Sequence, residues 1–151
     1  MGASPAILRP GAGDYDEVLQ VWEDSVRATH HFLREQDFEL FRSLLPQLLE
    51  VVDLHCTRDE AGRISGFLGT SNGKIEMLFM RPDQRGKGIG MALTRFALDT
   101  LGISKVDVNE QNVAALGFYR HAGFCVTDRS ATDSAGRPYP ILHLEHKREN
   151  A

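Results

Sequence analysis

Hydrophobic residues in the first third of the chain follow the spacing of a short strand and then of two helices. Residues 6–9 predict a strand that Pro10 and Gly11 end. A helix is predicted from Asp14, and its apolar positions are Val18, Leu19, Trp22 and Val26. The segment 29–32 interrupts this pattern. A second amphipathic helix is predicted from Glu35, ending near Pro46, with an apolar side formed by Phe38, Phe41, Leu44 and Leu45.

The pattern then changes to a period of two, which is typical of strands. Val52, Leu54 and Cys56 alternate with polar residues, so we expect a strand here. A turn at residues 59–62 leads to a second strand over residues 64–70. Asn72-Gly73 is a strong hairpin signal, and it precedes a third strand over residues 74–80. These residues predict a three-stranded antiparallel meander.

The second half of the chain alternates helices and strands. A glycine-rich loop follows Pro82, and a helix is predicted over residues 89–101 with Leu93, Phe96 and Ala97 facing inward. Next come a strand at 106–108, a helix from Asn112 that Gly123 closes, and a final hairpin of strands 124–128 and 141–145. The order β-αα-βββ-α-β-α-ββ predicts one α/β domain over residues 1–151, with a mixed, mostly antiparallel sheet and a disordered C-terminal end.

Composition and charge exclude several classes of protein. The 151 residues are 42% hydrophobic and 25% charged, with a net charge of −4 and no basic block, so we expect no nucleic-acid partner. The N-terminus has no basic segment before an apolar run, and no apolar stretch approaches the ~18 residues that span a bilayer. Cys56 and Cys125 form no CxxC motif, and we expect both to be buried and reduced. These features favour a cytoplasmic protein.

The segment Arg85-Gly86-Lys87-Gly88-Ile89-Gly90 is the strongest chemical signal in the chain. Its glycines let the backbone approach a ligand and point N–H groups at it. The following helix N-terminus and the two cationic side chains favour an anion such as a pyrophosphate. The spacing fits neither GxxxxGK[ST] nor GxGxxG. A glycine-rich turn that only starts a helix is the alternative interpretation.

Taken with its surroundings, this segment resembles the GNAT superfamily of N-acetyltransferases. Arg85, Gly88 and Gly90 meet the family's Q/R-x-x-G-x-G/A motif, and Asn112 with the Gly117-Phe118-Tyr119 segment matches its next helix. The resemblance implies direct transfer of an acetyl group from acetyl-CoA to a primary amine of a small molecule or peptide, in a ternary complex. An acyl-CoA-binding regulator without turnover is the alternative. The resemblance leaves room for a homodimer.

The resemblance also implies roles for individual residues. The pyrophosphate would be held by backbone N–H groups of Gly86, Lys87, Gly88, Ile89, Gly90 and Met91, with charge from Arg85. The pantetheine arm would pair with the backbone of Leu78, Phe79 and Met80, where this strand separates from its neighbour. Asn109 and Asn112 would lie on the other side of the acetyl-CoA molecule. A plain helix N-cap is the second role open to Asn112.

Three residues are candidates for proton transfer and acceptor binding. Tyr119 is the candidate general acid for the departing thiolate, and its alternative role is a packed aromatic. Glu76 is the candidate base, and its alternative is an exposed strand carboxylate. His30, in the segment expected to wall the acceptor pocket, is the rival base because the ordinary histidine pKa suits proton transfer, and its alternative is a cap or packing residue. His143 and His146 face opposite sides of a strand without a third ligand, so we expect no metal site.

Overall fold

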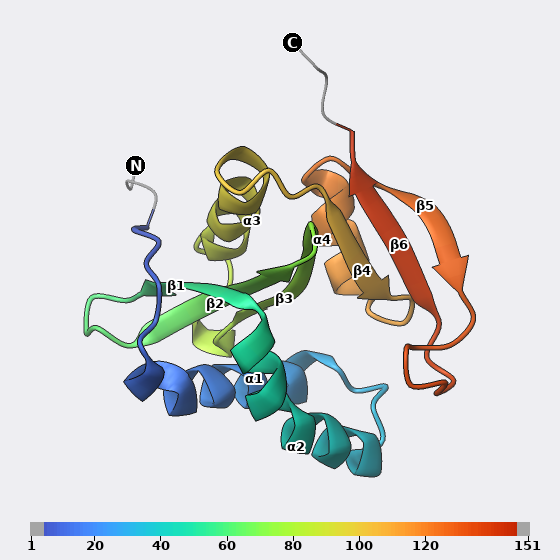
Figure 1. Ribbon diagram of the computed structural model, residues 1–151, viewed down its shortest axis with the longest axis horizontal. Coiled ribbons are helices and arrows are strands. Elements are labelled where there is room, and N and C mark those ends of the chain that lie inside the picture. The colour runs from blue at the N-terminus through green and yellow to red at the C-terminus, as the bar shows by residue number, and fades with distance from the viewer. Residues whose placement is uncertain (1–4, 148–151) are drawn as a thin grey trace.

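The computed structural model describes residues 5–147, which form one sheet covered by helices (Figure 1). The predicted disorder of the last residues concerns positions outside this range. The elements follow the expected order after the first strand. They are η1 Ala12–Asp14, α1 Tyr15–Thr29, α2 Glu35–Val51, β1 Asp53–Arg58, β2 Ile64–Ser71, β3 Lys74–Met80, η2 Pro82–Gln84, α3 Ile89–Asp99, β4 Lys105–Asn109, α4 Val113–His121, β5 Phe124–Ser130 and β6 Ile141–His146.

The sheet is mixed and has the order β1-β2-β3-β4-β6-β5. All neighbouring strands are antiparallel except β3 and β4. These two parallel strands pair only at Lys74 with Lys105 and at Ile75 with Val106. Beyond Ile75 the register ends while both strands continue, so they separate and open the sheet. The predicted α/β fold with a splayed, mostly antiparallel sheet is confirmed.

Helices cover both faces of the first three strands, with α1 and α2 on one face and α3 on the other (Figure 1). Leu93 and Ala97 of α3 are fully buried, and Phe96 packs against the same core, as predicted. Because β1 lies between two layers, its polar positions His55 and Thr57 are buried as well. The strand predicted here is confirmed as β1, although its polar positions are buried together with its apolar ones.

Two predicted boundaries are wrong. The N-terminal strand is reduced to one bridge, in which Leu8 N donates to Cys56 O at 2.9 Å and Cys56 N donates to Leu8 O at 2.7 Å. Helix α2 continues through Pro46 to Val51. Proline removes one helical hydrogen bond, but Leu45 and Leu49 on either side of Pro46 are buried and hold both halves of α2 against the core, whereas Leu44 is 41% exposed.

The two cysteines differ in exposure, which corrects the expectation that both are buried. Cys56 is fully buried and burial raises the pKa of its thiol, whereas Cys125 is exposed on β5. Because the thiolate is the reactive form, a thiol reagent should label Cys125 of the native protein and reach Cys56 only on unfolding. Mass spectrometry of the labelled protein checks this expectation. Rapid labelling of Cys56 in the native state would contradict it.

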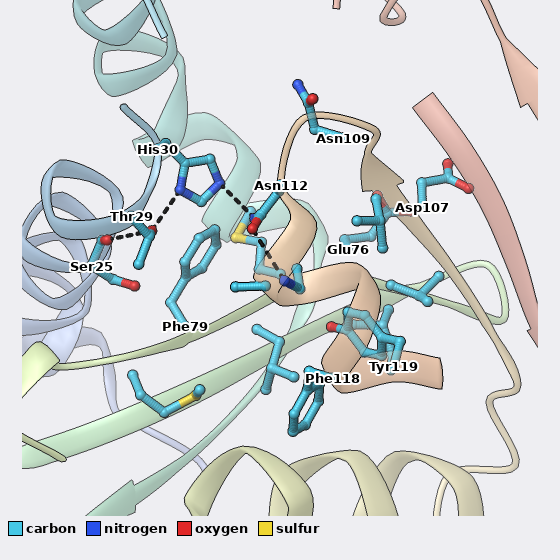
Figure 2. Close-up of a pocket in the computed structure, with 18 of the residues that line it drawn as sticks. Ser25, Thr29, His30, Glu76, Phe79, Asp107, Asn109, Asn112, Phe118 and Tyr119 are labelled. Atoms are coloured by element: carbon cyan, nitrogen blue, oxygen red, sulfur yellow. Dashed lines mark hydrogen bonds between the residues drawn. The ribbon is translucent and has the colours of Figure 1, made fainter. Parts of the chain in front are cut away.

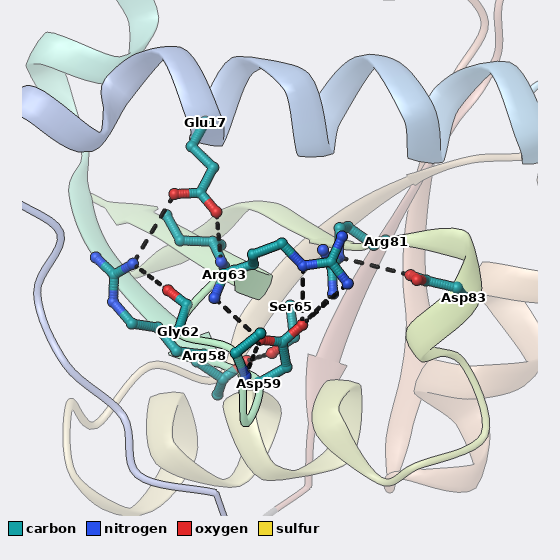
Figure 3. A network of polar contacts seen from close by, with 11 residues as sticks. Glu17, Arg58, Asp59, Gly62, Arg63, Ser65, Arg81 and Asp83 are labelled. Carbon is teal, nitrogen blue, oxygen red and sulfur yellow. Dashed lines mark hydrogen bonds and ion pairs between the residues drawn. The ribbon is translucent and has the colours of Figure 1, made fainter.

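A polar network fixes the base of the glycine-rich loop (Figure 3). The Arg81 guanidinium donates to Asp59 at 2.7 Å, and Arg81 N donates to Ser65 O at 2.9 Å. Desolvation raises the pKa of Asp59, but hydrogen bonds from Arg63 N–H, Arg81 and Ala61 N–H outweigh it and lower the pKa to about 2. The β1–β2 turn is thereby tied to the residue that precedes Pro82, where the chain leaves β3 for the loop.

Candidate active site

A cavity of about 310 Å³ lies where β3 and β4 separate, bordered also by α4 and the end of α1 (Figure 2). It brings together nine of the residues predicted from the sequence. They are His30, Glu76, Leu78, Phe79, Met80, Arg85, Asn109, Asn112 and Tyr119. The predicted phosphate-binding positions from Gly86 to Met91 follow Arg85 along the chain and are not part of the cavity wall.

Three glycines of the loop serve two different purposes. Gly86 and Gly88 have φ values of +76° and +79°, and a Cβ at either would meet no protein atom within 4 Å. Gly90 instead lies in the first turn of α3, where a Cβ would come within 3.0 Å of Met80 Cε and 3.3 Å of Phe118. The first two glycines shape an open backbone cradle, and Gly90 lets α3 pack closely. This open cradle at the start of α3 fits a phosphate group.

Tyr119 has the packing role that the sequence left open, and its place beside the cavity keeps the predicted general-acid role open. Its ring is buried and packs edge-on against Phe118 and Phe124, at 5.1 and 5.4 Å between ring centroids. The residue also borders the cavity. Burial raises the pKa of its hydroxyl far above that of a tyrosine in water. The hydroxyl therefore stays protonated at neutral pH, as a proton donor must.

Two carboxylates stand at the point where β3 and β4 part. Ile75 and Val106, the last paired residues, face the core that contains Tyr119. Asp107, the successor of Val106, therefore points to the opposite face of the sheet, where it binds Lys74. Glu76 lies at a bulge of β3 and joins it there, because both carboxylates raise the pKa of Lys74. Both line the cavity. The cavity passes between the strands, with Tyr119 on one side of the sheet and the carboxylates on the other.

Asp107 was not predicted from the sequence. Its Oδ2 accepts from Lys74 Nζ at 2.8 Å and its Oδ1 lies 2.7 Å from His143 Nδ1. Desolvation raises its pKa, but these two hydrogen bonds outweigh that effect and lower it, so Asp107 stays ionised. Glu76 is also exposed and accepts from Ser71 Oγ at 3.4 Å. The alternation of Val106 and Val108 indicates that the Asp107 side chain points away from the core. Its place beside Glu76, however, depends on the register between β3 and β4.

His30 lies at the end of α1 and is mostly removed from solvent. Burial, followed by the positive charges of Arg85 and His31, lowers its pKa to about 4. The expectation that its pKa suits proton transfer near neutral pH is therefore wrong. His30 Nδ1 lies 2.8 Å from Thr29 Oγ1, and His30 Nε2 lies 3.3 Å from Asn112 Nδ2. Asn112 is also the predicted N-cap of α4, since its Oδ1 accepts from Ala115 N at 3.1 Å.

The low pKa of His30 predicts a pH dependence of stability. In the unfolded chain the His30 imidazole is protonated below about pH 6.5, and in the folded protein only below about pH 4. The free energy of unfolding therefore falls as the pH drops between these two values. The difference corresponds to an effect on the order of 3 kcal/mol. Denaturant unfolding at several pH values should show this loss in the parent and most of it in a His31→Phe control, because His31 is the smallest of the three causes, and a much reduced loss in His30→Phe. Equal pH dependence in all three would contradict the assignment.

A splayed mixed sheet, a glycine cradle opening a helix and a tyrosine at the cleft together define a GNAT-type acetyltransferase. The family model described as acetyltransferase (GNAT) domain matches residues 43–138. The chain is 39% identical over 145 residues to the peptidyl-lysine N-acetyltransferase YjaB of Escherichia coli (strain K12), covering 93% of this chain and 96% of that protein. The protein therefore belongs to the GNAT acetyltransferase family and is an acyltransferase.

Solved structures agree with this assignment. The solution structure of apo-form YjaB from Escherichia coli matches with a TM-score of 0.81 and 36% identity, covering 93% of this chain and 96% of that one. The PaiA N-acetyltransferase from Thermoplasma acidophilum, solved with coenzyme A, matches with a TM-score of 0.73 and 21% identity, covering 97% and 100%, which supports the fold alone. Within residues 5–147, no helix is long and apolar enough to cross a membrane, and no three potential metal ligands cluster.

Proposed function

We propose that this protein transfers the acetyl group of acetyl-CoA to the side-chain amine of a lysine in a peptide or protein, by direct attack in a ternary complex. The observation that carries this proposal is the cavity between β3 and β4, with Tyr119 on one side of the sheet and Glu76 and Asp107 on the other. The name of the YjaB relative, a peptidyl-lysine N-acetyltransferase, supports the choice of acceptor.

The residues present fit acetyl-CoA, whose thioester would supply the electrophilic acetyl group. Backbone N–H groups of residues 86–91 would hold the pyrophosphate, because Gly86 and Gly88 leave the cradle open and α3 begins there. Arg85 would add a full positive charge. The backbone of residues 78–80, left without a β4 partner by the splay, would pair with the pantetheine arm. Asn109 and Asn112 would bound the opposite side.

The acid and the base would act from opposite faces of the sheet. A lysine amine is mostly protonated at neutral pH and must lose a proton before it attacks. The ionised Asp107 would attract the ammonium, and Glu76 would accept its proton, directly or through water. Tyr119, kept protonated by burial, would donate to the departing thiolate.

A panel of acceptors tests the proposal. The panel holds a lysine peptide with a blocked N-terminus, the same peptide with arginine in place of lysine and a free N-terminus, and a small polyamine. We expect acetylation of the blocked lysine peptide to be the fastest by at least about tenfold, the effect of about 1.4 kcal/mol in the transition state. Preference for the free N-terminus or the polyamine would overturn the choice of acceptor. Binding of acetyl-CoA without transfer to any amine would favour the regulator.

A further inference from the structure

A chain of hydrogen bonds crosses the cleft from α1 to α4 (Figure 2). Thr29 Oγ1 donates to Ser25 O at 2.7 Å and lies 2.8 Å from His30 Nδ1. His30 Nε2 lies 3.3 Å from the Asn112 side chain, 82 residues further along the sequence. All four residues line the cavity. Among the hydrogen bonds of residues 5–147, the Asn112 side chain thus has two partners, the Ala115 N–H of its own helix and the imidazole of His30.

The donor and the acceptor of each hydrogen bond in this series can be assigned from Thr29 at one end and from Asn112 at the other. A hydroxyl has one hydrogen, and the Thr29 hydroxyl gives it to Ser25 O, so its oxygen can only accept from His30. His30 therefore carries its proton on Nδ1, which leaves Nε2 as an acceptor. At the other end, Asn112 Oδ1 accepts from Ala115 N, so its NH₂ group faces His30. The assignment from Thr29 and the assignment from Asn112 both make His30 Nε2 an acceptor.

We propose that His30 is a positioning residue of the acetyl-CoA site, which holds the Asn112 amide so that its second N–H can donate to a carbonyl oxygen of the pantetheine arm. This inference rests on the proposed function. The Asn112 amide oxygen is occupied by Ala115 N–H, and one amide hydrogen by His30 Nε2. Its second amide hydrogen has no partner among the described residues, and we expect it to donate to an acceptor atom on the ligand. His30, whose Nε2 lone pair is already used, does not serve as the base.

The ring of His30 suits this role because it is fixed by packing as well as by hydrogen bonds. Its centroid lies 5.2 Å from that of Phe32 and 6.3 Å from that of Phe79, both in tilted contacts. A phenylalanine at position 30 would keep these contacts and remove both nitrogens. His31, the exposed neighbour outside the cavity wall, offers a matched control.

Calorimetric measurement of ligand affinity tests the inference. His30→Phe should weaken acetyl-CoA binding about tenfold, the effect expected from one misplaced hydrogen bond. Binding of adenosine 3′-phosphate 5′-diphosphate, which lacks the pantetheine arm, should stay unchanged, and His31→Phe should bind both ligands as the parent does. Asn112→Asp keeps an acceptor for Ala115 N–H but loses the donor, so it should show the same loss, with no further loss in the double variant.

A second readout needs no ligand. Nitrogen-15 NMR of the histidine rings in the free protein should find His30 protonated on Nδ1 and unprotonated on Nε2 at neutral pH. Protonation on Nε2, or unchanged acetyl-CoA affinity in folded His30→Phe, would overturn the inference while leaving the proposed function intact. Absence of acetyl-CoA binding by the parent protein would instead overturn the proposed function, and the NMR result would still decide the direction of the hydrogen-bond chain.

Discussion

Tyr119→Phe should slow the chemical step of acetyl transfer by about 10²-fold or more, the usual scale for general-acid catalysis. Phenylalanine keeps the ring that packs against Phe118 and Phe124, so the free energy of unfolding should change little. The change removes a proton donor that burial keeps protonated. Acetyl-CoA affinity should remain nearly constant, since the lost interaction belongs to the transition state rather than to binding. Single-turnover kinetics and calorimetry measure the two quantities separately.

The neighbouring aromatic provides a control for this variant. Phe118 also borders the cavity and touches the Tyr119 ring, but it has no proton to donate. Phe118→Leu should therefore alter stability or binding more than the rate of the chemical step. If chemistry is rate-limiting and Tyr119→Phe turns over within a few-fold of the parent, Tyr119 is not the general acid. Water or another group would then have to protonate the thiolate.

Gly88→Val should abolish most acetyl-CoA binding while leaving a folded protein. A β-branched side chain at φ +79° strains the backbone, and its atoms would project into the open cradle. Loss of two hydrogen bonds to phosphate, at ~1.5–3 kcal/mol each, would weaken binding by at least about 100-fold. Calorimetric titration measures the affinity, and thermal unfolding reports the strain.

Gly73→Val separates backbone strain from loss of the cradle. Gly73 has a φ of +74° and equally open surroundings, but it lies in the turn between β2 and β3. Both variants should lose stability, and only Gly88→Val should lose acetyl-CoA binding. Parent-like affinity in folded Gly88→Val would place the phosphates elsewhere on the protein.

Local sequence signals predicted the elements whose boundaries depend on local chemistry. The Asn72-Gly73 turn and the loop after Pro82 define β3, whose bounds agree with the prediction, and Asn112 caps α4 through its side chain as expected. The failures involve contacts between distant segments. Pro46 is tolerated inside α2 because Leu45 and Leu49 are buried by other elements. The N-terminal strand shrinks to the bridge at Leu8.

The same division applies to the candidate site. The glycine motif and the resemblance to the GNAT family identified Tyr119, Glu76 and the loop, and the structure brings Tyr119 and Glu76 to one cavity. Asp107 escaped prediction because its place beside Glu76 depends on a two-residue pairing of β3 with β4. The pKa of His30 depends on burial and on Arg85, which is 55 positions away in the numbering and adjacent only in the fold.

The most direct measurement follows the acetyl group during a single turnover. Protein in excess over acetyl-CoA is mixed with a lysine peptide that has a blocked N-terminus, and mass spectrometry records the peptide, the protein and free coenzyme A over time. Direct transfer predicts that acetylated peptide and coenzyme A appear together in equal amounts, with no acetylated protein at any time. Acetyl-CoA that binds but stays intact, or an acetylated form of the protein that precedes the peptide product, would contradict the account.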